Sequence, residues 1–267
     1  MNRTGLLIAL ALAVAVGLLF GIYPKLDLDL ERMFYDPAAA AIGGFWALYN
    51  PVLNRLRDLA RLISALLVAP AVLAVVGKLI APRRRMLIPG RAAVLLIATL
   101  ALGPGLVTNL VLKDHWGRPR PVDVNAFAGN LQFVPWWDPR GDCPSNCSFV
   151  AGEPSGAFWT LAPAALLPPA WRGPATAAAL VFGAGVGLIR MAGGGHFFSD
   201  VVFAGLFTFL IIWLTHGLLF RWPATRLSDR AIERALERLA RPRRTRPPKP
   251  VDPSAAAARP KAAGEGG

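Results

Sequence analysis

The sequence predicts an all-α membrane protein, a bundle of six transmembrane helices, and three observations favour this fold class. First, 54% of the 267 residues are hydrophobic and only 17% are charged, whereas soluble domains carry about a quarter charged residues. Second, six uncharged apolar runs approach the roughly 20 residues that a helix needs to cross a bilayer. Third, the charged residues gather between and after these runs. The composition also excludes a chain that is disordered over most of its length.

The six predicted spans differ in how strongly the sequence supports them. The first has no clear small-residue cleavage site before Tyr23, so we interpret it as an uncleaved anchor and not as a signal peptide. The second is short, but Arg61 and Lys78 at its ends can extend their charged groups to the two interfaces. Prolines inside spans are tolerated, because neighbouring groups in a bundle satisfy the freed carbonyls. The predicted spans are 5–22, 62–77, 92–112, 154–171, 173–189 and 201–220.

The distribution of basic residues predicts the orientation. The formal net charge is +13, and the segment from Arg221 to the end contains twelve basic and five acidic residues. With six spans, this segment lies on the same side as Arg83-Arg84-Arg85, Arg91 and Arg172. The positive-inside rule assigns that side to the cytoplasm, together with both termini. A basic tail can also indicate nucleic-acid binding, but the positive-inside rule already explains it, so we expect no nucleic-acid partner.

We therefore expect two parts in the chain. Residues 1–221 form the membrane-embedded domain, and residues 222–267 form a basic, Pro/Ala-rich cytoplasmic tail that is partly disordered. Within the tail, 227–240 places its leucines and Ile232 on roughly one helical face. This segment is either a helix on the inner membrane surface, where basic side chains meet anionic lipid, or an ordinary solvated helix.

Three polar clusters lie at the outer ends of predicted spans, where the positive-inside rule does not explain their cations. They are 113–121, 148–153 and 190–200. Lys113, Arg120 and Arg190 would converge there, and converging cations repel one another unless an anion binds between them. Arginine presents a planar fork suited to phosphate oxygens, and lysine supplies a point charge. The glycines 193–195 can bring backbone N–H groups close to an anion. The clusters together predict a phosphate site.

His196 and Asp200 are four residues apart, one helical turn if that stretch is helical. The carboxylate could then accept a proton from one ring nitrogen and leave the other nitrogen free as a nucleophile. Glu153 is the remaining ionisable group and could protonate the leaving oxygen. Each feature also has a simpler interpretation: Lys113 and Arg118 can be interfacial anchors, and His-x-x-x-Asp is common on helices. Their joint spacing favours a catalytic site.

The long outer segment 122–147 carries two further features. Cys143 and Cys147 lie four residues apart and can form a small disulfide in an oxidising compartment, or remain two free thiols. Trp136, Trp137 and Phe133 can shape the choice of substrate, or anchor the segment at the membrane interface.

At this point the sequence resembles the type-2 phosphatidic acid phosphatase superfamily of membrane lipid-phosphate phosphatases. The family pattern begins with Lys, six residues and Arg-Pro, which Lys113 and Arg120-Pro121 match. It ends with Ser-Arg, five residues, His, three residues and Asp, which Arg190, His196 and Asp200 match, although Ile189 replaces the serine. The matched motifs and the six-span layout cover roughly residues 5–220.

The resemblance implies a role for each matched residue. His196 would be the nucleophile, Asp200 would orient it, and Lys113, Arg120 and Arg190 would hold the phosphate. The family uses no metal or cofactor.

The middle motif, Pro-Ser-Gly-His in the family, is where this chain departs. Pro154-Ser155-Gly156 fits it only with Ala157 in place of the histidine. The better alignment takes Ser148-Phe149 as the usual lead-in and sets 150–153 against the motif, so that Gly152 keeps its backbone role and Glu153 replaces the histidine. Glutamate acts as an acid near neutral pH only if its pKa is raised from about 4.3.

There are two alternatives to the interpretation that Glu153 is the acid. His115 is a second candidate for the acid. Glu153 could instead be only a charge partner for Arg120 or Arg190.

We expect a phosphatase that hydrolyses a lipid phosphomonoester or pyrophosphate through a phosphohistidine. Candidate substrates are lipid A, undecaprenyl diphosphate and phosphatidylglycerophosphate, because a site at the ends of spans can reach a headgroup whose tails stay in the bilayer. A lipid-to-lipid phosphotransferase and a non-catalytic lipid-phosphate binding or transport protein are the alternatives. The expected location is the bacterial inner membrane, with the active site facing the periplasm. The sequence does not determine the oligomeric state.

Overall fold

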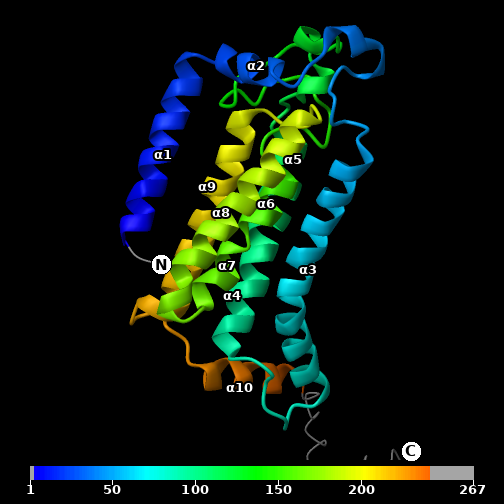
Figure 1. Cartoon of the computed structure of the whole chain (residues 1–267). Helices are drawn as coiled ribbons and strands as arrows, with labels where there is room; N and C mark the ends of the chain where they lie inside the picture. Colours follow the sequence, from blue (N-terminus) through cyan, green and yellow to red (C-terminus); the bar gives the residue numbers. More distant parts are fainter. Residues whose placement is uncertain (1–2, 241–267) are drawn as a thin grey trace, which may run out of the picture.

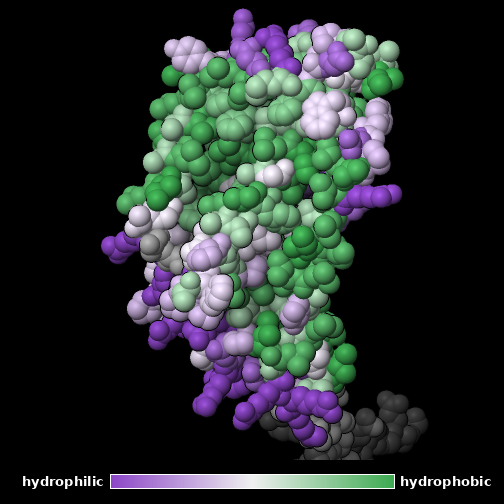
Figure 2. Space-filling view, in the orientation of Figure 1, coloured by the Kyte–Doolittle hydropathy of each residue, from purple (hydrophilic) through white to green (hydrophobic). Residues whose placement is uncertain are grey.

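The chain forms an elongated bundle of helices in a computed structural model that describes residues 3–240 (Figure 1). Within these described residues, five helices are long and apolar enough to cross a membrane. The space-filling view shows a predominantly hydrophobic surface between two hydrophilic ends (Figure 2), as expected of a multi-pass membrane protein. The five are α1 (Arg3–Ile22), α3 (Pro51–Ile80), the continuous α4 (Gly90–Leu100), η2 (Ala101–Leu112) and α5 (Lys113–His115), α8 (Pro169–Ala192), and α9 (Phe198–His216) with η5 (Gly217–Arg221).

The predicted fourth span, 154–171, is not a single helix. It is divided into α6 (Gly152–Phe158) and α7 (Leu161–Leu166). Pro163 explains the break, because proline has no N–H to donate to the Trp159 carbonyl and its ring crowds that carbonyl. The Trp159 carbonyl accepts a hydrogen bond instead from the N–H of Ala162, at 2.8 Å and only three residues further on, so the turn is tighter than in an α-helix. The all-α fold class is thus confirmed, whereas the continuous fourth helix was wrong.

Helix α3 begins eleven residues before the predicted span. Asn50 caps it, since its side-chain oxygen accepts from the N–H groups of Val52 and Leu53 at 3.0 and 3.1 Å, and Pro51 occupies the first helical position. Both residues are favoured at helix starts. The charged first turns of α3, including Arg57, therefore belong to the helix, although the predicted span begins only at residue 62.

The middle of the long α4–η2–α5 helix is wound more loosely around Pro104. The freed backbone is partly satisfied by Asn109, whose side-chain amide donates to the Pro104 carbonyl at 2.6 Å. Such wide turns often occur at functional sites. This segment leads directly to Lys113, which begins α5.

The two longest connecting segments, 23–50 and 116–151, gather at one end of the bundle (Figure 1). They include α2 (Lys25–Arg32), η1 (Pro37–Ile42), η3 (Pro121–Asp123) and η4 (Asn125–Phe127). A small aromatic core of Phe45, Phe127 and Phe197 holds them together. The same end receives α5, the start of α6 and the start of α9, so the three predicted polar clusters lie at one end.

Helix α10 (Asp229–Ala240) lies across the opposite end, against α3 and α4. Ile232 of α10 is buried against the start of α4. A Cβ added to Gly90 would lie 3.0 Å from its side chain. Lys78 of α3 contacts Glu233 and Glu237 at 3.6 and 2.7 Å. The predicted amphipathic face is therefore packed on the helical bundle. The rest of the predicted tail, 241–267, lies outside the described residues.

Candidate active site

The fold brings the predicted site residues together from four separate segments. Lys113 begins α5, Glu153 lies in the first turn of α6, Arg190 lies in the last turn of α8, and His196 precedes α9. The imidazole of His196 is buried, with 1% of its surface exposed. Burial, and then the positive charges of Arg190, Lys113 and Arg120, hold the pKa of His196 well below its usual value. The three predicted cations therefore surround His196, which is neutral at neutral pH.

The hydrogen-bond partner of His196 differs from the one expected. Its Nδ1 lies 2.7 Å from the backbone carbonyl oxygen of Ser148, not against Asp200. A carbonyl only accepts, so Nδ1 carries the proton and Nε2 keeps its lone pair. Nε2 is thus available as a nucleophile, and a backbone carbonyl, not a carboxylate, orients the ring.

Asp200 is linked to His196 only indirectly, through Ser148. It accepts from the Ser148 hydroxyl at 2.6 Å and from the Phe197 N–H at 2.9 Å. Asp200 is the third residue of α9, and a side chain at that position reaches back to the N-cap N–H. It therefore fixes Ser148, whose carbonyl holds His196.

Arg118 lies at the centre of a buried polar network that includes Asp200. It is fully buried and donates to Asp200, to Ser199 at 2.9 Å and to Asp27 of α2 at 2.8 Å. The interfacial-anchor interpretation of Arg118 was wrong. Glu31 lies nearby, and its buried carboxyl oxygens have no hydrogen-bond partner within residues 3–240. Burial, then the charges of Asp200 and Asp27, raise the pKa of Glu31 well above its usual value, which favours its protonated form.

Asn146 holds two of the cations in place. Its backbone oxygen accepts from Nε and Nη2 of Arg120 at 3.0 and 2.7 Å, and its side-chain oxygen accepts from Lys113 at 3.2 Å. Asn146 lies between Cys143 and Cys147, which form a disulfide. The disulfide-closed turn therefore presents oxygen acceptors to the cations of the site.

Arg190 and Gly152 occupy crowded positions. The Nε of Arg190 is buried and has no hydrogen-bond partner in the described part of the chain, so a donor is left for a ligand. The Arg190 guanidinium packs so closely on Gly195 that a Cβ there would clash with it. At Gly152, a Cβ would lie 2.8 Å from Asn109 Oδ1 and 3.1 Å from Lys113 Nζ. Glycine at both positions thus allows the cations to approach the backbone closely.

Glu153 forms a bidentate ion pair with Arg57 of α3. Its two oxygens accept from Arg57 Nε at 2.8 Å and Nη2 at 2.6 Å, and its Oε2 lies 4.0 Å from Arg190 Nε. Burial would raise the pKa of Glu153, but the hydrogen bonds from Arg57 and the charges of Arg190 and Arg57 outweigh it and lower that pKa. Glu153 is therefore ionised in the empty site. His115 is exposed, and its Nδ1 lies 2.9 Å from the Val111 carbonyl.

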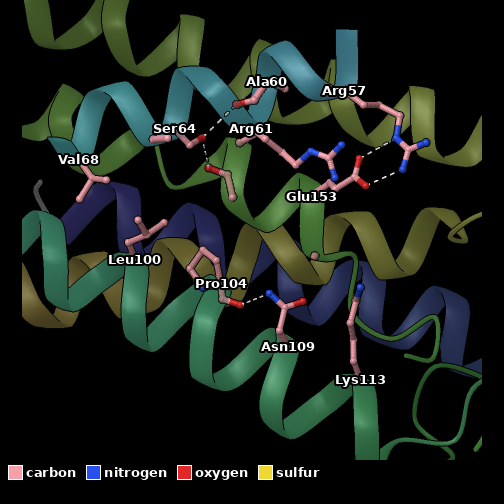
Figure 3. Close-up of a pocket in the computed structure, with 14 residues that line it drawn as sticks. Arg57, Ala60, Arg61, Ser64, Val68, Leu100, Pro104, Asn109, Lys113 and Glu153 are labelled. Atoms are coloured by element: carbon pink, nitrogen blue, oxygen red, sulfur yellow. Dashed lines mark hydrogen bonds and ion pairs between the residues drawn. The ribbon is translucent and has the colours of Figure 1, made fainter. Parts of the chain in front are cut away.

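A groove of about 420 Å³ leads from these charges along α3 and η2. Figure 3 shows Arg57, Glu153 and Lys113 at one end and Val68 and Leu100 at the other. A groove that is charged at one end and apolar along its length suits an amphiphile.

Sequence reasoning missed Arg57, Asn146 and the Ser148 carbonyl. The helix-start signal Asn50-Pro51 could have placed Arg57 on α3, one helix turn from the span. No local signal identifies Asn146 or Ser148, because a backbone oxygen is available in every residue. Trp136 packs on Phe203, with ring centroids 4.4 Å apart, so it is a partly buried residue that packs against the hydrophobic core.

Both a family model and individual known proteins are similar to this chain. Residues 92–224 match the model of the PAP2 superfamily. A "Lipid A 4'-phosphatase" of Francisella tularensis subsp. novicida (strain U112) is 39% identical over 224 residues, which cover 83% of this chain and 98% of that protein. Proteins of the same name from Rhizobium leguminosarum and Rhizobium etli are each 37% identical, over 43% of this chain and 49% and 45% of their own length. No solved structure is significantly similar.

Proposed function

This chain belongs to the PAP2 superfamily and is a membrane lipid phosphatase, and we propose that it removes a phosphate from lipid A. The observation that carries the proposal is the 39% identity to a lipid A 4'-phosphatase across 98% of that protein's length. By this likeness, the substrate is the 4'-phosphate monoester. The charged and apolar ends of the groove support a substrate with a phosphorylated headgroup and acyl chains.

In the proposed mechanism, Nε2 of His196 attacks the phosphorus and the bond from phosphorus to the sugar oxygen breaks. Lys113, Arg120 and Arg190 neutralise the charge on the three equatorial oxygens as the phosphoryl group transfers. Glu153 gives a proton to the departing sugar oxygen. A water molecule then gives a proton back to Glu153 and attacks the phosphorus, which breaks the bond between phosphorus and nitrogen, releases inorganic phosphate and restores His196.

The sharpest test of this function is a panel of lipid phosphates offered to the purified protein in detergent. Lipid A, undecaprenyl diphosphate and phosphatidylglycerophosphate are compared, with released phosphate and dephosphorylated lipid both measured. We expect lipid A to lose one phosphate per molecule without any second lipid present. If phosphate appeared only on an added acceptor lipid, the protein would be a phosphotransferase instead.

We further propose six membrane crossings, in which α6 and α7 together replace the predicted fourth span. Helix α6 starts at the end that holds the active site, and α8 returns to that end with Arg190 in its last turn. The basic segments then lie in the cytoplasm and the active site faces the periplasm of a bacterial inner membrane.

A reporter fused after Gly267 should therefore be active in the cytoplasm. With six crossings, the C-terminus lies on the same side as the basic loop at Arg83-Arg84-Arg85. Alkaline phosphatase and green fluorescent protein fusions give opposite signals on the two sides. An active alkaline phosphatase at this position would invert the proposed orientation and place the site in the cytoplasm.

Phosphate release should be unchanged by EDTA. The groups that surround His196 are cations, and they would repel a divalent metal while supplying the charge that a metal supplies in other phosphatases. The rate is measured after dialysis against EDTA and again after magnesium is added. A loss of activity that magnesium restores would contradict the proposed mechanism.

A further inference from the structure

The ion pair between Arg57 and Glu153 joins α3 to the first turn of α6 at the edge of the active site (Figure 3). Arg57 uses Nε and Nη2 for the carboxylate, and its Nη1 donates to Asn54 at 2.8 Å. Both side chains of the pair are only about one-fifth exposed, at 23% and 21%. A guanidinium binds two phosphate oxygens with the same parallel geometry. The carboxylate therefore occupies hydrogen bonds that a phosphate could take.

The neighbouring charges show that this pair belongs to the phosphate site. Glu153 Oε2 lies 4.0 Å from Arg190 Nε, the buried donor that has no hydrogen-bond partner among residues 3–240. Burial lowers the pKa of Arg120, and the positive charge of Arg57 contributes to that shift. Arg57 is thus close enough to interact electrostatically with the cations that surround His196. Glu153 is the anion that balances them while the site is empty.

We propose that Arg57 is a fourth phosphate-binding cation, which holds Glu153 in the empty site and exchanges this carboxylate for phosphate oxygens when the substrate binds. The proposal rests on the proposed function, because it assumes the same phosphate site. A substrate phosphate carries more charge and more acceptor oxygens than one carboxylate, so it competes well for Arg57. The exchange draws the headgroup toward α3, which also forms one wall of the groove.

The exchange also resolves a difficulty with the acid role of Glu153. Its pKa is lowered by the hydrogen bonds from Arg57, and an ionised carboxylate has no proton to give. Once Arg57 turns to the phosphate, these hydrogen bonds are lost and the phosphate charge offsets the remaining cations. Both changes raise the pKa of Glu153, so the carboxyl can take up a proton when the substrate is bound and not before.

The proposal is tested by the affinity of the detergent-purified protein for inorganic phosphate, taken from the rise in Tm with phosphate concentration. Four proteins are compared: the wild type, Glu153→Gln, Arg57→Gln/Glu153→Gln and Arg55→Gln/Glu153→Gln. Glu153→Gln should bind phosphate about tenfold more tightly than the wild type, because the competing carboxylate is gone. The Arg57→Gln/Glu153→Gln variant should then bind about 10-fold to 100-fold more weakly than Glu153→Gln, since a charged hydrogen bond is lost.

The double variants leave no acidic partner unpaired, which protects the comparison from misfolding. Arg55 is an exposed arginine two residues earlier on the same helix, so Arg55→Gln controls for a general loss of positive charge and should not change the affinity. Equal affinities of Glu153→Gln and Arg57→Gln/Glu153→Gln would overturn the proposal and leave Arg57 as a partner of Glu153 only. A comparable weakening by Arg55→Gln would overturn it too.

The two proposals fail separately. If the wild-type protein released no phosphate from any lipid, the proposed function would fail whatever the phosphate affinities were. If it dephosphorylated lipid A but the affinities did not depend on Arg57, only the role of Arg57 would fail.

Discussion

His196→Ala should abolish phosphate release from lipid A, with a loss of at least about 1,000-fold, because the variant has no nitrogen to accept the phosphoryl group. In the structure, the Ser148 carbonyl holds Nδ1 and leaves Nε2 free for attack. The measurement is the rate of phosphate release by purified variant protein, compared with the wild type at equal concentration. Retention of more than a few per cent of the activity would remove His196 as the nucleophile.

A matched control separates the loss of the nucleophile from misfolding. His115→Ala removes an exposed imidazole from the same end of the molecule and should keep near wild-type activity. A large loss there would return His115 as the acid candidate. The elution volume and Tm of the His196→Ala protein should match those of the wild type, because alanine at 196 leaves the network of Arg118, Asp200 and Ser148 intact.

Glu153→Gln should slow hydrolysis of lipid A by about 10²-fold to 10⁴-fold, the usual contribution of a general acid. Glutamine keeps the size of the side chain but has no proton to transfer to the sugar oxygen. An alkoxide is a poor leaving group and depends on this proton. The measurement is kcat for phosphate release from lipid A.

The leaving group distinguishes the acid role from a purely electrostatic one. With p-nitrophenyl phosphate, whose leaving group scarcely needs a proton, Glu153→Gln should lose far less activity. Glu153→His should retain appreciable activity, because histidine is the residue that the resemblance places there. An equal loss on both substrates would contradict the acid role, and Glu153 would then be a charge partner of Arg57.

The ionisation of Glu153 predicts a direction for the pH dependence of Arg57→Gln. Arg57 lowers the pKa of Glu153, so its removal raises that pKa toward the value that burial favours. More Glu153 is then protonated at a given pH in the free protein. If protonated Glu153 is the acid, the alkaline limb of kcat/KM should move to higher pH in this variant, although the total rate falls.

Membrane location and phosphate chemistry followed from the sequence alone, and each has a local cause. A spanning helix needs an uninterrupted apolar run, so composition along the chain identified four of the spans closely and a fifth, α3, only in its apolar part. The spacings from Lys113 to Arg120 and from Arg190 to His196 are short enough that backbone geometry keeps each pair at one end of the bundle. These spans and these two spacings agree with the structure because they depend only on residues that are close together in the sequence.

Only the structure determined which residues of the site contact one another, because the contacting residues come from distant segments of the chain. Arg57 and Glu153 are 96 residues apart, Arg118 and Asp27 are 91 apart, and His196 and Ser148 are 48 apart. Only helix packing brings such groups within hydrogen-bond distance, and a sequence motif gives no information about it. The interrupted fourth span has a local cause instead, because Pro163 stands at the break, whereas Pro70, Pro104 and Pro174 lie inside helices that continue.

Asp200 illustrates the difference most clearly. Its spacing of four from His196 is compatible with a direct hydrogen bond, and the sequence alone could not exclude one. In the fold, α9 begins at Phe198, which puts His196 before the helix and Asp200 within its first turn. The carboxylate is then taken by the Phe197 N–H, the Ser148 hydroxyl and Arg118. The sequence determined which residues we propose for the chemistry, whereas the start of one helix and the packing around it decided which atoms each of them contacts.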